Sequence, residues 1–221
     1  MKIALERSVE LPLGEVDLNG DLTLPVGARG VVVFAHGSGS SRMSPRNRFV
    51  ARQLQEAGLG TLLMDLLSPG EESIDIRTRH LRFDIDLLAG RLVGAIDWLR
   101  AQPETSALKV GCFGASTGAA AALVAAAERP LAVGAVVSRG GRPDLAGDAL
   151  GRVLAPTLFI VGGDDDAVIE LNVEALRHLN CPNALKIVPG ATHLFEEPGT
   201  LETVARLASD WFRQHLPGSI H

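Results

Sequence analysis

The sequence predicts an α/β protein: a three-layer α/β/α sandwich with a mostly parallel β-sheet and an N-terminal antiparallel hairpin. Short, almost wholly apolar runs recur along the chain, as is typical of strands covered on both faces; they span 31–35, 61–64, 109–113, 132–137, 157–161 and 184–188. Segments with helical patterns separate these runs, and this alternation requires a mostly parallel sheet with helices on both faces. Residues 8–24 instead alternate apolar and polar side chains, which indicates a hairpin.

The N-terminal hairpin is expected to turn at Asn19-Gly20. This dipeptide favours the type I′ turn of two-residue hairpins, and side chains alternate on both sides of it. After the strand at 31–35, a Ser-Pro pair and a glycine predict a helix over 45–57. Serine caps a helix, proline begins it and glycine ends it. The strand at 61–64 follows.

The second half of the chain repeats the alternation of strands and helices. Residues 68–83 are polar and predict a long loop, whose charged side chains either contact a substrate as a partial lid or are solvated. Apolar residues at helical spacing predict a helix over 85–99, and an alanine-rich run predicts another over 119–127. The last two helices are expected to end at Leu179 and to span 201–211.

One domain is expected to span residues 1–221, because no linker, repeat or low-complexity segment divides the chain. The connection at 138–144 is too short and polar to form a separate cap domain. The net charge of −5 comes without a basic block, which argues against nucleic-acid binding. Because no apolar segment resembles a signal peptide or is long enough to span a bilayer, we expect a cytoplasmic protein without membrane contact.

The segment 114–118 (GASTG) lies where a predicted strand meets a predicted helix. A serine between two glycines at such a junction matches the nucleophile elbow G-x-S-x-G, a turn so sharp that side chains at the glycine positions would clash. The turn would present the Ser116 hydroxyl above the sheet. It would also place the Thr117 N–H at a helix N-terminus, where an oxyanion is stabilised. The alternative is an ordinary glycine-rich turn.

A serine nucleophile needs a histidine base, and His193 is the candidate among the six histidines. His193 follows the strand at 184–188, in the kind of strand-end loop where functional groups of parallel sheets gather. The alternative for His193 is an ordinary loop histidine. The other histidines are expected to be structural or solvated: His178 and His215 in amphipathic helices, His80 in the polar loop, His221 at the chain terminus, and His36 as a brace of its own loop.

Three consecutive acids, Asp164, Asp165 and Asp166, follow the strand at 157–161. They lie between the serine and the histidine in the chain, where the acid that orients the histidine is expected, although all three could instead cap the next helix. Asp164 directly follows two glycines and belongs to the turn, whereas Asp166 is nearest the helix. Asp165 is therefore the acid predicted to point inward.

The segment 36–41 (HGSGSS) follows the strand at 31–35 and is a candidate oxyanion hole. Its glycines would let backbone N–H groups face the reacting carbonyl. The alternative is a flexible glycine-serine turn.

Three motifs together resemble the α/β-hydrolase superfamily, and more narrowly its small, capless, dienelactone-hydrolase-like members: 35–41 (AHGSGSS), 113–118 (FGASTG) and 190–195 (GATHLF). The resemblance covers nearly the whole chain and includes hydrolases that are sometimes fused to phosphoribosyltransferase domains. It implies the α/β-hydrolase fold, with Ser116 as nucleophile, Asp165 as acid and His193 as base. It also implies an oxyanion hole formed by the N–H groups of Ser38 and Thr117. Dienelactone hydrolases themselves carry cysteine at the nucleophile position, so the resemblance does not imply dienelactone as the substrate.

The sequence therefore predicts a serine hydrolase that acts on small or soluble carboxylic esters through an acyl-enzyme. No metal or cofactor is expected, since the two cysteines have neither metal-ligand nor disulfide spacing. Two alternatives remain: an acyltransferase or perhydrolase that uses the same triad, and a catalytically silent α/β-hydrolase-fold protein that binds a partner or small ligand. The sequence indicates no oligomeric state.

Overall fold

The computed structural model describes residues 2–216, so the terminal His221 lies outside the described residues. Its centre is an eight-stranded sheet in the order β1-β2-β4-β3-β5-β6-β7-β8. The pairs β1–β2 and β2–β4 are antiparallel and all other neighbours are parallel, as predicted. The strands are β1 (Ile3–Leu13), β2 (Val16–Pro25), β3 (Val31–Ala35), β4 (Gly60–Met64), β5 (Val110–Ala115), β6 (Val133–Arg139), β7 (Thr157–Gly162) and β8 (Asn183–Val188).

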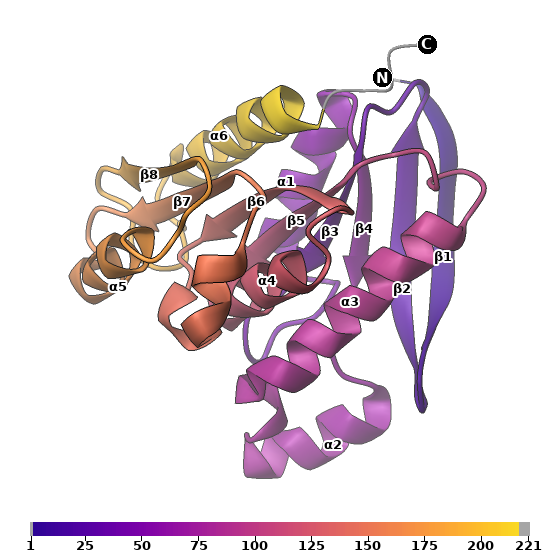
Figure 1. Cartoon of the computed structure of the whole chain (residues 1–221), viewed down its shortest axis with the longest axis horizontal. Helices are drawn as coiled ribbons and strands as arrows, with labels where there is room; N and C mark the ends of the chain where they lie inside the picture. The colour runs from indigo at the N-terminus through magenta and orange to yellow at the C-terminus, as the bar shows by residue number, and fades with distance from the viewer. Residues whose placement is uncertain (1, 217–221) are drawn as a thin grey trace.

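Helices cover both faces of the sheet and complete the predicted three layers (Figure 1). Val31 and Val33 of β3 pack with α3 and α4 on one face, whereas Val32 and Phe34 pack with α1 and α6 on the other. Burial on both faces explains why the central strands are apolar at every position. The helices are α1 (Pro45–Glu56), α2 (Pro69–Thr78), α3 (Ile85–Ala101), α4 (Thr117–Glu128), α5 (Asp166–Leu176) and α6 (Thr200–His215), with short 3-10 segments η1 (Leu81–Phe83) and η2 (Pro143–Arg152). Within residues 2–216, none of these helices combines the length and apolar character needed to cross a bilayer.

The hairpin forms, but its predicted turn at Asn19-Gly20 is wrong. The chain turns instead at Gly14, whose φ of 75° suits glycine, between β1 and β2. Asn19 and Gly20 lie inside β2, which pairs with β1 on one side and β4 on the other. A Cβ at position 20 would lie 3.1 Å from a methyl group of Leu62 and 3.2 Å from one of Leu11. This glycine serves close packing rather than a turn.

The polar segment 68–83 contains a helix where the sequence predicted a loop. The Ser68 hydroxyl accepts from the Glu71 N–H, and the Glu71 carboxylate accepts from the Ser68 N–H, which together form a capping box. Proline follows the cap and begins α2. The apolar residues Ile74 and Ile76 are exposed, so no apolar stripe marks the helix. Capping residues therefore identify α2, whereas hydrophobic periodicity does not.

The strand order places two loops together at one edge of the sheet. After β3 the chain passes to β4 on one side and then to β5 on the other side of β3. Carboxyl ends of neighbouring strands diverge into a crevice where the order reverses in this way. The loop after β3 and the turn after β5 both lie there. The connection predicted at 138–144 differs in detail, because its first two residues complete β6 and η2 follows them.

Candidate active site

The turn between β5 and α4 has the sharp geometry predicted for segment 114–118. Ser116 has a φ of 51° and a ψ of −121°, a left-handed backbone that non-glycine residues rarely adopt. A Cβ at Gly114 would lie 2.4 Å from the Cα of Ala119, and a Cβ at Gly118 would lie 2.4 Å from the carbonyl oxygen of Ala35. Only glycine fits at either position. The strained turn points to a functional role for the serine between them.

Helix α4 lies directly behind this serine. Every residue from Thr117 to Ala127 is buried, which the small alanine side chains permit. Thr117 is the first residue of the helix, so its N–H has no intrahelical acceptor. The helix dipole adds a partial positive charge at this end.

The ring of His193 is held by Asp165. The His193 Nδ1–H donates to Oδ2 of Asp165 at 2.7 Å, which leaves Nε2 as the acceptor nitrogen of a neutral ring. Asp165 occupies the N-cap position of α5, yet its side chain caps no N–H of that helix. Asp164 and Asp166 are exposed. Of the three adjacent acids, Asp165 is thus the one that contacts His193.

Ser116 and His193 line one cavity of about 200 Å³. Residues 37 and 38, which follow β3, line it as well, and a Cβ at Gly37 would lie 3.2 Å from the Cβ of Ser116. The Ser116 hydroxyl forms no hydrogen bond with a protein group in residues 2–216. The cavity therefore brings together a free hydroxyl, an imidazole and the loop after β3.

Of the predicted oxyanion donors, Ser38 lines this cavity, whereas Thr117 directly follows Ser116 in the chain and lines a smaller neighbouring pocket that Ser38 shares. Within the part of the chain that the structure describes, the N–H groups of Ser38 and Thr117 donate to no protein acceptor. Unpaired N–H groups beside a serine hydroxyl can receive a developing negative charge.

His36 braces the loop that contains Ser38, as the sequence suggested. Its Nδ1–H donates to the carbonyl oxygen of Gly37 at 2.9 Å, and its Nε2 accepts from the N–H of Leu66 at 3.1 Å. Burial lowers the pKa of His36 below its ordinary value. The ring therefore stays neutral and connects the ends of β3 and β4.

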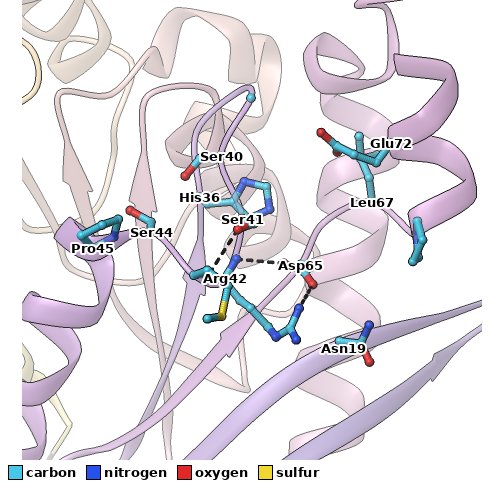
Figure 2. A pocket seen from close by; sticks show the side chains of 13 residues that line it. Asn19, His36, Ser40, Ser41, Arg42, Ser44, Pro45, Asp65, Leu67 and Glu72 are labelled. Carbon is cyan, nitrogen blue, oxygen red and sulfur yellow. Dashed lines mark hydrogen bonds and ion pairs between the residues drawn. The ribbon is translucent and has the colours of Figure 1, made fainter. Parts of the chain in front are cut away.

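A larger cavity, about 520 Å³, lies beside the same loop but contains neither Ser116 nor His193 (Figure 2). The Arg42 N–H donates to Asp65 Oδ1 at 2.8 Å and its guanidinium pairs with the same carboxylate, which anchors the loop to the end of β4. Ser40 and Ser44 line both cavities. Glu72 of α2 lines the larger cavity and not the one with the serine. The segment 68–83, suggested as a partial lid, therefore borders this larger cavity, and it also lines a small pocket together with Ser38 and Thr117.

The remaining histidines lie away from the serine. His80 contacts the Thr78 hydroxyl at 2.7 Å, and His178 lies 3.4 Å from Glu174, both at the surface. His215 packs against the ring of Trp211. No group of three or more His, Cys, Asp or Glu side chains in residues 2–216 is arranged to hold a metal ion.

Two charged residues of the serine cavity were not predicted, Arg46 and Arg139. The sequence placed Arg139 in a polar connection, but it is the last residue of β6 and only 7% exposed. Its backbone lies beside Ala115 in the sheet, and its carbonyl oxygen accepts from the Ser116 N–H at 3.3 Å. An arginine at the end of an otherwise apolar run was the available signal.

A model of the dienelactone hydrolase family matches residues 18–216. The chain belongs to the dienelactone hydrolase family. A crystal structure of a dienelactone hydrolase from Anabaena variabilis is 63% identical to it, with a TM-score of 0.95 over 97% of this chain and 99% of that one. The chain is thus similar to a hydrolase of this family over nearly its whole length.

Two Mycobacterium tuberculosis relatives, from strains CDC 1551 and H37Rv, are named as phosphoribosyl transferases. Each is 60% identical over 213 residues, which is 96% of this chain and 47% of the relative. The chain thus spans about half the length of these curated relatives. Est1E from Butyrivibrio proteoclasticus shares the fold, with a TM-score of 0.78 and 16% identity over 95% of this chain and 98% of its own.

Proposed function

We propose that this dienelactone hydrolase family member is a serine esterase that hydrolyses small carboxylic esters. Ser116 is the nucleophile, His193 the general base and Asp165 the acid that orients it. The observation that supports this most is the 2.7 Å bond between His193 and Asp165, in a cavity that His193 shares with a serine on a strained elbow.

The reaction would follow from these positions. The His193 Nε2 takes the proton of the Ser116 hydroxyl as Oγ attacks the acyl carbon. The tetrahedral intermediate places its oxyanion on the N–H groups of Ser38 and Thr117. Its collapse breaks the ester bond, and His193 returns the proton to the departing alcohol. A water molecule, activated by the same nitrogen, then attacks the acyl-enzyme and releases the acid.

Asp165 has two tasks in this scheme. Its bond to Nδ1 selects the tautomer in which Nε2 is free to accept a proton, and its charge stabilises the imidazolium that forms. Removal of a single oxyanion donor typically costs about 100- to 1,000-fold in kcat. The two N–H groups are therefore expected to contribute to the rate in addition to the triad.

A fluorophosphonate probe tests the proposal together with hydrolysis of 4-nitrophenyl acetate. We expect labelling and turnover in the wild type, and loss of both in Ser116→Ala, with mass spectrometry locating the label on Ser116. The circular dichroism spectrum of Ser116→Ala should match the wild type, because the hydroxyl makes no bond within residues 2–216. Wild-type turnover in Ser116→Ala would contradict the nucleophile assignment. An unlabelled, inactive wild type would favour the silent binding protein.

Acyl transfer and perhydrolysis use the same triad, so they need a separate measurement. Added methanol or hydrogen peroxide competes with water for the acyl-enzyme. At low concentrations of methanol or hydrogen peroxide, an esterase should release mainly the free acid. If the methyl ester or the peracid were the main product, the protein would instead be an acyltransferase or a perhydrolase.

A further inference from the structure

Arg139 is a buried cation in the wall of the proposed active site. It is 7% exposed and lines the same cavity as Ser116 and His193. Its Nε and Nη1 atoms are inaccessible and have no hydrogen-bond partner. Buried guanidinium groups are normally paired with a carboxylate, because a charge removed from water costs several kcal/mol when nothing compensates it.

No acid in the described chain compensates this charge. The cavity is lined by two arginines, Arg46 and Arg139, and by no carboxylate. Burial first, and the like charge of Arg46 second, lower the pKa of Arg139 to about 10. Within residues 2–216 the guanidinium makes one cation–π contact, with the ring of Phe195, whose centroid lies 5.8 Å from the guanidinium carbon. A cation–π contact of this kind offsets part of the cost of burying the charge but does not replace a counter-ion.

Two neighbours in the same cavity also carry unpaired polar atoms. Asn47 is 2% exposed, and its side-chain oxygen is a buried acceptor without a partner, so this atom does not itself bind an anion. Arg46 pairs with Glu196 through Nη1 at 3.1 Å on the exposed side, while its Nε is buried and unpaired. The unpaired N–H groups of Arg46 and Arg139 therefore belong to two residues that line one small space beside the reactive serine.

We propose that Arg139, assisted by Arg46, binds an anionic group of the ester that Ser116 attacks. This inference rests on the proposed esterase function. The group is a carboxylate or a phosphate, since both accept the paired N–H donors of a guanidinium. Because the cavity measures only about 200 Å³, the anion lies a few bonds from the reacting carbonyl. The preferred substrate is then a short ester that already bears a negative charge.

Matched esters test the inference on the full chain. Three aryl acetates differ only in their para substituent: methyl 4-acetoxybenzoate is neutral, 4-acetoxybenzoate carries a carboxylate, and 4-acetoxyphenyl phosphate carries a phosphate. A second pair, 4-nitrophenyl hexanoate and mono-4-nitrophenyl adipate, moves the charge to the acyl side. We expect an anionic member of at least one series to exceed its neutral match by about 10-fold or more in kcat/KM. The favoured substituent distinguishes carboxylate from phosphate.

Variants then assign the preference to Arg139. Arg139→Gln should lower the ratio of kcat/KM for the favoured anionic ester to kcat/KM for its neutral match by about 10-fold or more. Arg139→Lys should retain part of the preference, since it keeps the charge without the planar fork. Arg142→Gln is the matched control. The guanidinium of Arg142 pairs with Asp144 and does not line the cavity, so this variant should keep the wild-type ratio.

Inhibition of the wild-type protein by anions is a second test, and it does not depend on whether a variant at the buried Arg139 folds. Benzoate or inorganic phosphate should inhibit hydrolysis of the neutral ester competitively, and benzamide should not. Equal kcat/KM for anionic and neutral esters in both series overturns the anionic subsite, as does an Arg139→Gln variant that slows both kinds of ester equally. Either result leaves the esterase itself intact. Failure of the proposed function looks different, because the wild type would then hydrolyse none of these esters and would not react with the phosphonate probe.

Discussion

At the scale of single residues, three adjacent aspartates in the same loop have different surroundings. The backbone of Asp165, with a φ of −120° and a ψ of 61°, directs its side chain to His193 and away from the helix that it precedes. Asp164 and Asp166 are exposed on either side of it. All three residues are aspartates, so only the direction of each side chain decides which of them contacts His193.

Asp165→Asn should lower kcat for ester hydrolysis by about 100-fold or more. The amide can donate to Nδ1, which stabilises the tautomer in which Nε2 carries the proton and cannot act as a base. Asp164→Asn and Asp166→Asn are matched controls and should stay within about threefold of the wild type, because neither contacts the ring. Thermal melts of the three variants show whether a loss of activity reflects unfolding. If Asp166→Asn lost activity and Asp165→Asn kept it, Asp166 rather than Asp165 would be the acid that orients His193.

At the scale of elements, local sequence signals predicted most strands and helices but missed features set by neighbours. Asn19-Gly20 has the composition of a turn, yet β2 is paired on both edges there, and that pairing is not visible in local sequence. Helix α2 was missed because its apolar residues form no stripe, although its capping box was present in the sequence. The elbow was predictable because a Cβ at either of its glycines would clash with nearby backbone, and this requirement is visible in the local sequence.

Gly118→Ala should destabilise the fold by several kcal/mol, since its new methyl group would lie 2.4 Å from the carbonyl oxygen of Ala35. Gly90→Ala is the control within α3, where a Cβ meets nothing within 4 Å. That change should raise the free energy of unfolding by about 0.5–1 kcal/mol, because alanine has less backbone entropy to lose than glycine in a helix. Urea melts of both variants measure these effects. A Gly118→Ala protein of wild-type stability would contradict the close approach of α4 to β3.

The loop after β3 should become less stable as the pH falls. Burial lowers the pKa of His36, so the unfolded chain binds a proton more readily than the folded one. The stability contributed by neutral His36 is present above its ordinary pKa of about 6.5 and is lost as the pH falls through the lower, folded value.

His36→Gln removes this titration and keeps an acceptor for the Leu66 N–H. Its free energy of unfolding in urea should therefore fall less than that of the wild type between about pH 7 and pH 5. His80→Gln changes an exposed histidine and should reproduce the wild-type slope. Identical slopes in wild type and His36→Gln would show that His36 does not titrate with unfolding.

At the scale of the whole molecule, strand order brings the parts of the site together. The reversal between β3 and β5 places the N–H of Ser38 beside Ser116, and the loops after β7 and β8 bring Asp165 to His193. A sequence read along the chain locates these loops, because each follows an apolar strand. It does not show that Arg139 is buried beside Ser116, since this depends on the register in which Ala115 pairs with Arg139 across β5 and β6.

The size of the cavity limits the acyl chain that the molecule can accept. About 200 Å³ is below the roughly 300 Å³ at which pockets for larger ligands begin. A site that buried a whole acyl chain would gain about 0.8 kcal/mol, or about fourfold in kcat/KM, for each added methylene group. We therefore expect kcat/KM for neutral 4-nitrophenyl esters to stop rising at butyrate and to stay level or fall towards decanoate. The series is measured below the micelle concentration of each ester, with spontaneous hydrolysis subtracted. If kcat/KM kept rising about fourfold per methylene group from butyrate to decanoate, the protein would bind the acyl chain in a larger apolar site than this cavity provides.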